Sequence, residues 1–257
     1  MRKLFTIVSL LSLTMVSCTT DEKMSEEKGE GRVSITCDVA TEVVDTRANV
    51  TCTTPSEADF ALEIVGVDIE YAAKYASLAE FAEDNYLHHG KYKATVKTGD
   101  VTAEGYDMAA FAGSEEFTVV AREDLEVKVT ATIVNALVKV EVTEAFKSYF
   151  PGGHSLKLTT AAGNEFDVTE QTEPLFIAPE SFTITGTATK QPNQSGAEGL
   201  TVTLPEYHNE TLREQTLYTI KLDVENAGSA ALEITLNDNL VESYDIEQEL
   251  NDYAEEK

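Results

Sequence analysis

The sequence has no tryptophan, few cysteines and few basic residues. Its 257 residues include 19 Lys or Arg and 46 Asp or Glu, so the formal net charge is −27. This balance argues against nucleic acid and anionic bilayer surfaces as partners, because both are bound through basic patches. It also disfavours a polyanionic glycan ligand, and solubility accounts for most of the acidity. The absence of Trp weakens the case for a sugar-stacking platform, although Tyr could substitute.

Sequence motifs of catalysis and metal binding are missing as well. There is no G-x-S-x-G, no Walker loop and no G-x-G-x-x-G, and no CxxC supports a zinc site. The segment Asn237–Asn239, with Glu242, lacks the glycine and the ligand count of a calcium loop. The histidines show no metal-binding spacing: His88, His89, His154 and His208. We therefore expect no catalytic residue, no metal site and no cofactor, although abundant carboxylates leave a glycosidase pair open.

The first 18 residues have the pattern of a bacterial lipoprotein signal. Arg2 and Lys3 precede an apolar run, Leu4 to Val16, which is too short to span a bilayer as a helix. Ser17 and Cys18 follow, and a cysteine at such a cleavage point can accept diacylglycerol on its thiol. We expect removal of residues 1–17 and lipidation of Cys18, which would anchor the protein stably. The alternative is an ordinary cleaved signal with a cysteine nearby by chance.

Composition divides the remaining chain into three parts. Residues 18–32 are acidic and contain one large apolar side chain, Met24, so they are expected to form a flexible tether. A hydrophobic content of 42% is enough for a globular core beyond the tether. The break at Pro151-Gly152-Gly153 suggests a boundary. We expect one β-sandwich domain at 33–148 and a second at 149–257.

Alternating apolar residues predict β-strands along most of the chain. In Val33–Val39, every second residue is apolar, which indicates a strand with one buried face. In Lys91–Lys97, Tyr92, Ala94 and Val96 share one face. The Ala-rich stretch 71–83 has a helical stripe instead. Because short strands recur without βα alternation, the sequence predicts an all-β fold of two tandem antiparallel sandwiches.

The longest β signal, Leu125 to Val142, changes parity in its middle. Its apolar residues lie on one face up to Ile133 and on the other from Val134 onwards. The segment is therefore either two strands or one strand bent at Val134-Asn135, which could serve two sheets. We expect Val138, Val140 and Val142 to be buried in the first domain.

The order of these segments resembles the fimbrillin-like lipoproteins of Bacteroidetes, and most closely a branch described as a domain of unknown function. The similar segments, within residues 60–150, are Gly90–Ala94, Gly99-Asp100, Phe111, Gly113–Val119, Val127–Val142 with Asn135-Ala136 inside, and Phe146–Phe150. The resemblance implies two tandem sandwich domains (Greek-key, transthyretin-like) and an outer-membrane lipoprotein precursor. The acidic run after Cys18 is similar to surface-export signals of such lipoproteins.

In related fimbrial subunits, an arginine-specific protease removes an N-terminal strand, and a strand of the next subunit fills the groove. The resemblance implies such a site at Asp45-Thr46-Arg47-Ala48, with cleavage between Arg47 and Ala48; an exposed loop arginine is the alternative. Cys37 and Cys52 lie on opposite sides of that bond. They could form a disulfide in an oxidising compartment, which would lock the strand to the body, or remain free thiols.

The resemblance favours a structural and adhesive subunit of a fimbrium, assembled by donor-strand complementation after N-terminal processing. Its expected partners are the outer membrane, through the lipid, other subunits through strand addition, and a host or glycan ligand. The alternative is a permanently anchored, monomeric surface lipoprotein that binds a glycan or host ligand. An enzyme is the least favoured hypothesis.

Overall fold

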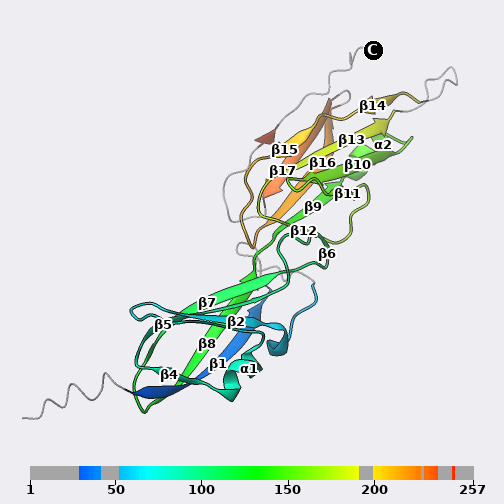
Figure 1. The fold of residues 1–257 in the computed structure, drawn as a ribbon. Helices are drawn as coiled ribbons and strands as arrows, with labels where there is room; N and C mark the ends of the chain where they lie inside the picture. The colour runs from blue at the N-terminus through cyan, green and yellow to red at the C-terminus, as the bar shows by residue number, and fades with distance from the viewer. Residues whose placement is uncertain (1–28, 42–51, 191–198, 227–228, 237–244, 247–257) are drawn as a thin grey trace, which may run out of the picture.

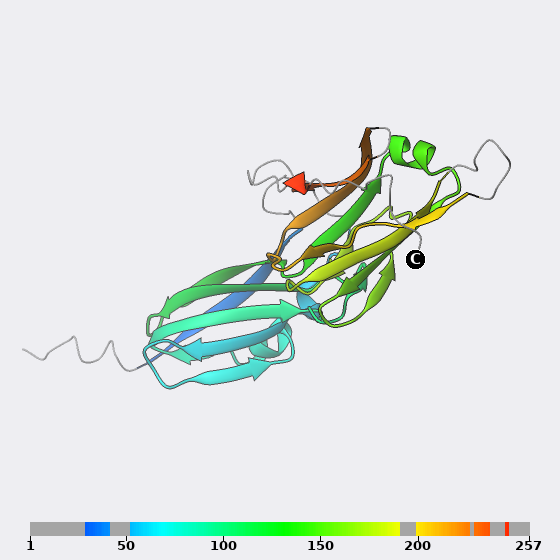
Figure 2. The same cartoon turned by 90° about the horizontal axis from the view of Figure 1, so that it is seen from above.

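The computed structural model describes residues 29–41, 52–190, 199–226, 229–236 and 245–246. Figure 1 shows two lobes joined where strand β8 passes into β9. The view in Figure 2, turned by 90°, also places the lobes end to end. The regular elements of the described chain are mostly β-strands, with two short α-helices, which confirms the all-β fold class.

The first lobe contains one seven-stranded sheet. Its strand order is β3-β2-β5-β7-β8-β1-β4. The strands are β1 (Glu30–Ala40), β2 (Ala61–Gly66), β3 (Ala72–Tyr75), β4 (Tyr86–His88), β5 (Gly90–Thr98), β7 (Phe111–Val119) and β8 (Asp124–Ile133). Two short helices accompany them: the 3-10 helix η2 (Glu57–Asp59) and α1 (Leu78–Glu83). The stretch expected to be one helix, 71–83, is thus partly strand β3 and partly α1.

A curled sheet and helix α1 enclose the first hydrophobic cluster. The helix contacts β2 and β3 near one end of the sheet and also β1 near the other end, so it bridges the two ends. It contributes buried Leu78 and Phe81. The alternating pattern predicted for β5 is present, with Tyr92, Ala94 and Val96 fully buried. Strand β7 pairs with β8 only at Phe111–Ile133 and Ala112–Thr132, so the sheet curls over at this point and, with the helix, closes the first lobe in a sandwich-like way.

The parity change in the longest β segment marks the passage between the lobes. Strand β8 belongs to the first sheet, whereas β9 (Ala136–Val142) belongs to a different, six-stranded sheet. Asn135 lies between them and is fully buried. Its side-chain oxygen accepts a hydrogen bond from the Ala110 N–H at 2.6 Å, and its carbonyl accepts one from Gln215 N–H at 2.8 Å. Of the two alternatives, the structure has two strands, which end and begin on either side of Val134-Asn135 and belong to different sheets.

Two facing sheets form the second lobe. One has the order β11-β10-β13-β14, with β15 also paired to β13, and the other has the order β18-β17-β16-β9-β12-β6. The strands of the first are β10 (His154–Thr160), β11 (Glu165–Asp167), β13 (Phe182–Thr189), β14 (Thr201–Thr203) and β15 (Tyr207–Asn209). The second adds β6 (Gly105–Tyr106), β12 (Leu175–Ile177), β16 (Leu217–Asn226), β17 (Ser229–Leu236) and β18 (Asp245–Ile246). The helix α2 (Glu144–Tyr149) contacts β16.

The second hydrophobic cluster begins earlier in the sequence than expected. Val138 and Val140 pack in this second cluster, with Val142 half-buried against it, and not in the first as predicted. Phe146 and Phe150 belong to it as well. The second cluster thus begins with Ala136, directly after Asn135 and before the expected boundary at 148/149, while Leu137 on the other face of β9 still packs in the first cluster. The division into two domains remains a prediction.

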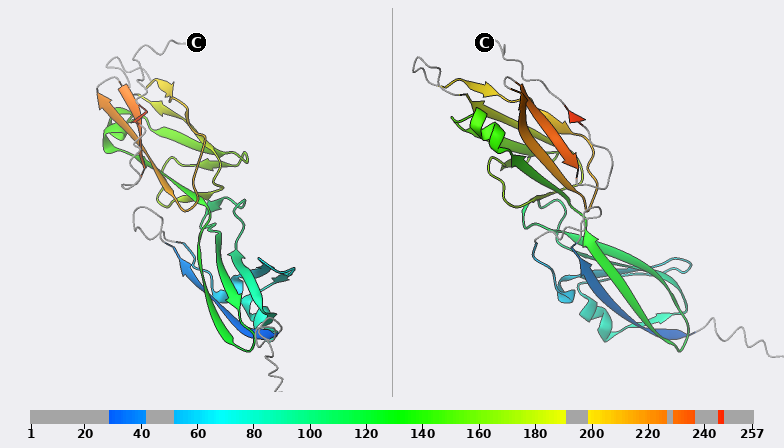
Figure 3. Two further views of the ribbon diagram at one scale, coloured as in Figure 1. Left: turned by 90° about the vertical axis from the view of Figure 1, so that its left-hand side faces the viewer. Right: turned by 180° about the vertical axis from the view of Figure 1, so that it is seen from behind.

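Most strand pairs are antiparallel, as predicted, but two pairs are parallel. Strand β1 runs parallel to β8, and β16 runs parallel to β9. Figure 3 shows β1, in blue, alongside the green β8 in both of its views. The two parallel pairs are thus built on consecutive halves of the same β8–β9 segment.

Candidate assembly site at the N-terminal strand

Strand β1 is held mainly by a long parallel ladder with β8. The register runs from Arg32 opposite Asp124 to Ala40 opposite Thr132. On its other side, β1 pairs with β4 only over Glu30–Arg32. Strand β1 is therefore internal to the sheet for its first residues and an edge strand for the rest of its length, within the part of the chain that the structure describes.

The inner face of β1 completes the first hydrophobic cluster. Val33 is 0% exposed, Ile35 9% and Cys37 5%, and Val39 is half-buried against the same cluster. Across the ladder, Ile35 faces Val127 and Cys37 faces Val129. Because burial of a Val or Ile side chain stabilises by about 1.5–3 kcal/mol, loss of β1 would leave an apolar groove in the first lobe.

The outer edge of β1 is covered by backbone and side-chain acceptors instead of a full strand. The Val33 N–H donates to the Asn85 carbonyl oxygen at 2.9 Å, just before β4. Further along, the Cys37 N–H donates to the Glu57 carboxylate at 3.1 Å. A side-chain carboxylate thus replaces a neighbouring strand at this amide, which blunts an edge that could pair with another chain.

The chain that follows the expected cleavage site has, besides the contact of Glu57 with β1, contacts of its own that do not involve β1. The Thr53 N–H donates to Asp107 Oδ1 at 2.8 Å, and its hydroxyl donates to Asp107 Oδ2 at 2.7 Å. These two bonds hold the pKa of Asp107 below its usual range. A capping box between Ser56 and Asp59 begins helix η2, and Phe60 behind it is fully buried. The segment from Thr53 onwards is therefore attached to the body of the first lobe.

Both cysteines near this site are free thiols in the structure. Cys37 is buried and Cys52 is half-buried. Burial raises the pKa of the Cys37 thiol, as do Glu57 and Asp38 to a smaller extent, while a backbone hydrogen bond from Ala131 opposes them. Burial and then Asp107 raise the pKa of Cys52. Raised pKa values reduce the thiolate fraction that forms disulfides, and a disulfide between the two remains a prediction.

The other predicted site residues lie outside the part of the chain that the structure describes. They are the lipidation site Cys18 and the two residues of the expected cleavage site, Arg47 and Ala48. The structure nevertheless places the residues on either side of the cleavage site: Ala40 ends β1, and Thr53 is bound to Asp107. Their roles remain predictions.

The segment that joins β5 to β7 along the chain, residues 99–110, reaches from the first lobe to the second, and we call it the strap. It begins at Gly99, where φ is +75° and a Cβ would lie 2.9 Å from the Ala109 carbonyl oxygen, so glycine is required there. Within the strap, β6 adds to the edge of the six-stranded sheet by pairing with β12. Asp107, at a φ of 55°, follows β6 and carries the contact with Thr53.

Glu104 fastens this strap to the second lobe. Its carboxylate accepts hydrogen bonds from the Thr160 hydroxyl at 2.6 Å, the Asn164 side-chain amide at 2.8 Å and the Ala178 N–H at 3.0 Å. The strap thus connects Thr53, on the first lobe, with the second sandwich. Glu104, Asp107 and Glu57 were not predicted, because nothing in the sequence distinguishes these carboxylates from the many others.

The histidines are dispersed, and three of the four serve local contacts. His88 faces Glu30 at 3.5 Å, the His154 ring lies 3.2 Å from the Thr169 carbonyl oxygen, and the His208 ring lies 2.8 Å from the Thr183 hydroxyl oxygen. Within the described ranges, no three metal-ligating side chains converge. The loop Asn237–Asn239 lies outside those ranges. Likewise, none of the described helices has the length and apolar character needed to cross a membrane.

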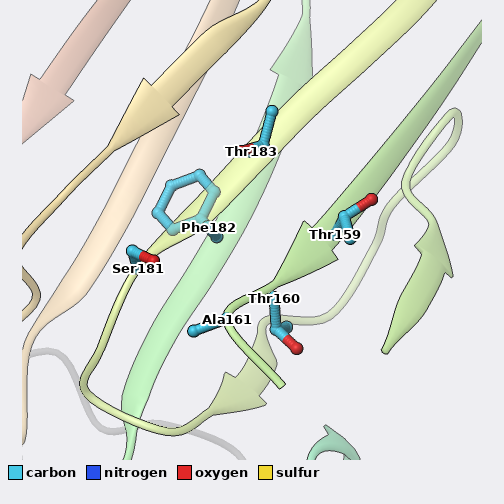
Figure 4. Close-up of a pocket in the computed structure, with 6 residues that line it drawn as sticks. All are labelled: Thr159, Thr160, Ala161, Ser181, Phe182 and Thr183. Carbon is cyan, nitrogen blue, oxygen red and sulfur yellow. The ribbon is translucent and has the colours of Figure 1, made fainter. Parts of the chain in front are cut away.

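A shallow hollow of about 380 Å³ lies between the end of β10 and the start of β13. Figure 4 shows its lining residues: Thr159, Thr160, Ala161, Ser181, Phe182 and Thr183. Two of its hydroxyls already bond to protein groups, since Thr160 donates to Glu104 and Thr183 bonds to His208. The Phe182 side chain is buried in the second cluster and presents no ring surface for stacking. The hollow therefore offers hydroxyls but neither a charged group nor an aromatic platform.

These features define a two-lobed all-β protein whose first lobe depends on an N-terminal strand. The family model described as "Domain of unknown function (DUF4493)" matches residues 27–252, so the chain belongs to that family. This confirms the expected relation to a branch described as a domain of unknown function. No curated protein matches the chain.

Solved structures from Bacteroidetes are similar to it at low identity. A fimbrial assembly protein from Parabacteroides distasonis is 14% identical with a TM-score of 0.44, over 82% of this chain and 100% of that one. A candidate cell adhesion protein from Bacteroides eggerthii is 10% identical with a TM-score of 0.38, over 77% and 86%. Another, from Bacteroides ovatus, is 12% identical with a TM-score of 0.36, over 85% and 99%.

Proposed function

We propose that the protein is a lipid-anchored subunit of a cell-surface fimbrium that assembles by donor-strand complementation. In this proposal, the signal is removed before Cys18, the cysteine is lipidated, and the precursor is held at the outer membrane. Cleavage between Arg47 and Ala48 then separates β1 from the rest of the chain. A strand of another subunit takes the place of β1, and no catalysis, metal or cofactor is involved.

The observation that carries this proposal is the position of β1. The strand precedes the expected cleavage site, contributes buried Val33 and Ile35 to the first cluster, and is paired with β8 along nearly its whole length. Its removal would expose both the apolar groove and the unpaired edge of β8. Exposed edges of this kind pair readily with another chain, with main-chain hydrogen bonds for affinity and alternate side chains for register.

Two further features support release of the strand alone. In this proposal Cys37 and Cys52 stay free thiols, as they are in the structure, so that no disulfide would tie β1 to the chain beyond the cleavage site. The chain after the site is held by Asp107 through Thr53, so it would stay in place when β1 leaves. Both features support a subunit that can exchange its first strand while the rest of the lobe remains folded.

The test compares the mature protein with an Arg47→Lys variant, which keeps the charge but resists an arginine-specific protease. Each is digested, and intact mass and sedimentation are measured with and without reductant. We expect the wild type to yield a fragment that begins at Ala48, to lose β1 without reductant, and to form multimers. The variant should stay monomeric with β1 attached.

A synthetic peptide with the sequence of β1 provides the specificity control. Added in excess after cleavage, it should reoccupy the groove and suppress multimers, whereas the same peptide with Ile35→Asp should not. A cleaved protein that keeps β1 or stays monomeric would overturn strand exchange. An intact N-terminus on a monomer isolated from the native membrane would instead favour the permanently anchored, ligand-binding lipoprotein.

A further inference from the structure

The exposed face of β5 carries a row of lysines on an otherwise acidic protein. Lys91, Lys93 and Lys97 are exposed, with half-buried Thr95 between the last two on the same face, while Tyr92, Ala94 and Val96 belong to the first cluster. Residues two apart on a strand lie on the same face at a spacing of roughly 7 Å. The three ammonium groups therefore follow one line along the outside of the sheet, which we call the lysine strip.

The lysine strip is not neutralised by ion pairs. Among the described residues, none of its three lysines has a carboxylate within ion-pair distance, whereas Lys74, Lys128, Lys139, Lys147 and Lys157 each have one. Lys91 has Thr118 as its cross-strand neighbour, and Lys97 has Ala112. Glu116 stands opposite Lys93 and is the one carboxylate directly across β7 from the strip.

Exposed valines border the lysine strip on the β2 side. Val65 lies directly across from Lys93 and is 41% exposed. Val67 is 55% exposed, and its N–H donates to the Lys91 carbonyl oxygen at 2.7 Å. A row of cations beside apolar side chains fits a partner that offers both carboxylates and apolar surface, which is typical of a protein surface. A polyanionic glycan would leave the valines without a function.

We propose that the lysine strip binds an acidic surface of a second copy of this chain. The partner follows from charge: each copy has a formal net charge of −27, so another copy offers many carboxylates to the strip. The strip gives one orientation in which two such copies attract rather than repel each other, and charge complementarity of this kind sets register and specificity. The contact goes beyond the proposed strand exchange and does not require cleavage at Arg47.

The ionic strength determines whether this contact can form. At about 0.15 M salt, the Debye length is about 8 Å, so repulsion between whole molecules is largely screened. Direct contacts between ammonium and carboxylate groups are shorter than that length and persist. At about 1 M salt the Debye length falls to about 3 Å, and the contact should weaken. Alone it is weak, and within a fibre the tethered neighbours would strengthen it through their high effective concentration.

The experiment cross-links intact, unprocessed protein with a carbodiimide, which joins a lysine amine to a carboxylate in direct contact. Protein of natural isotope content is mixed equally with ¹⁵N-labelled protein, so that peptides joining light and heavy chains identify contacts between copies. The test variant carries Lys91→Gln, Lys93→Gln and Lys97→Gln. The control variant carries Lys139→Gln, Lys147→Gln and Lys157→Gln, which removes the same number of positive charges from the second lobe.

We expect light–heavy links from the strip lysines in about 0.15 M salt, with fewer in about 1 M salt. They should disappear in the strip variant and persist in the control variant. Absence of such links, or equal linking through the second-lobe lysines, would overturn the proposal. So would strip-dependent retention on an anionic glycan or an anionic vesicle without light–heavy links. Because the protein is uncleaved, failure here is distinct from failure of strand exchange, which the Arg47→Lys comparison tests.

Discussion

Glu104 is the residue on which the contact between the strap and the second lobe depends most. One carboxylate accepts three hydrogen bonds there, from a hydroxyl, a side-chain amide and a backbone N–H. Thr160, one of the donors, is buried. A buried donor that loses its acceptor retains its full desolvation cost, so these bonds matter more than exposed ion pairs.

Replacement of Glu104 by Ala should lower the free energy of unfolding by about 2–4 kcal/mol, because it removes charge-assisted bonds and leaves donors unpaired. Glu104→Gln keeps one acceptor oxygen and should lose less. Urea denaturation measures both. Glu173→Ala is the control, since Glu173 is exposed and its loss should change stability by less than about 0.5 kcal/mol. Equal stabilities of Glu104→Ala and Glu173→Ala would contradict the role given to Glu104.

Asp107 should make the segment after the cleavage site sensitive to acid. Hydrogen bonds from Thr53, first its backbone N–H and then its hydroxyl, lower the pKa of Asp107 in the folded protein. A lowered folded pKa adds stability above the unfolded value, about 3.9 for Asp, and this stability is lost as the pH falls through the folded pKa. Asp59, Asp100 and Asp167 are shifted in the same direction.

The Asp107→Asn variant should therefore be less stable than the wild type at about pH 6 and should lose less stability on acidification. Unfolding curves collected from about pH 6 down to about pH 2 measure this difference. Hydrogen exchange at the Thr53 amide should accelerate in the same acidic range in the wild type. If the stabilities of the wild type and the variant fall in parallel with pH, the Thr53–Asp107 contact does not contribute to the acid sensitivity.

At the scale of elements, the alternation of apolar residues predicted the strands that are long enough to show it. The alternation in β1 and β5 and the parity change at Val134-Asn135 all follow from a two-residue repeat read against one buried face. The strands β6 and β15 are too short to show any period, and they were not predicted. In 71–83, the four-residue spacing of Tyr71 and Tyr75 imitates a helix, but Tyr71 lies just before β3 and packs against Tyr92, and Tyr75 ends β3 and packs against Phe81.

Strand partners and their direction could not be predicted from the sequence. Nothing local in Val33–Val39 indicates a parallel partner about ninety residues away, since the same alternation suits either direction. The candidate assembly site could likewise be predicted only in part. Its periodic strand was identified, whereas Glu57, Glu104 and Asp107 act through long-range contacts that one sequence does not show.

The buried face of β1 gives a prediction at this scale. Ile35→Ala should destabilise the first lobe by about 2 kcal/mol, at the lower end for buried Ile because the strand is at the sheet edge. Thr36→Ala is the matched control, since Thr36 is the next residue of β1 and lies on its exposed face, and this change should affect stability little. Thermal or urea unfolding of the uncleaved protein distinguishes them. Similar losses in both variants would mean that β1 is not packed as described.

For the whole molecule, the remaining prediction concerns anchoring. Replacement of Cys18 by Ser should leave the precursor without lipid and shift it out of the outer-membrane fraction, because no acyl chain is then attached. Intact mass and membrane fractionation measure both effects. Replacement of Ser17 by Thr keeps Cys18 and should keep the lipid. Retention of the Cys18→Ser variant in the membrane, at the wild-type level, would refute the anchor.

The continuous β8–β9 segment determines how the molecule would bear tension. A force along the long axis of the molecule is carried across Asn135 by the covalent chain. It is then transmitted to β1, which is parallel to β8, and to β16, which is parallel to β9. The load on both ladders is then directed along the strands, so that many hydrogen bonds must slide together instead of opening one by one. The parallel pairing of a first strand, or of a strand that replaces it, would thus make the junction between lobes resistant to stretching.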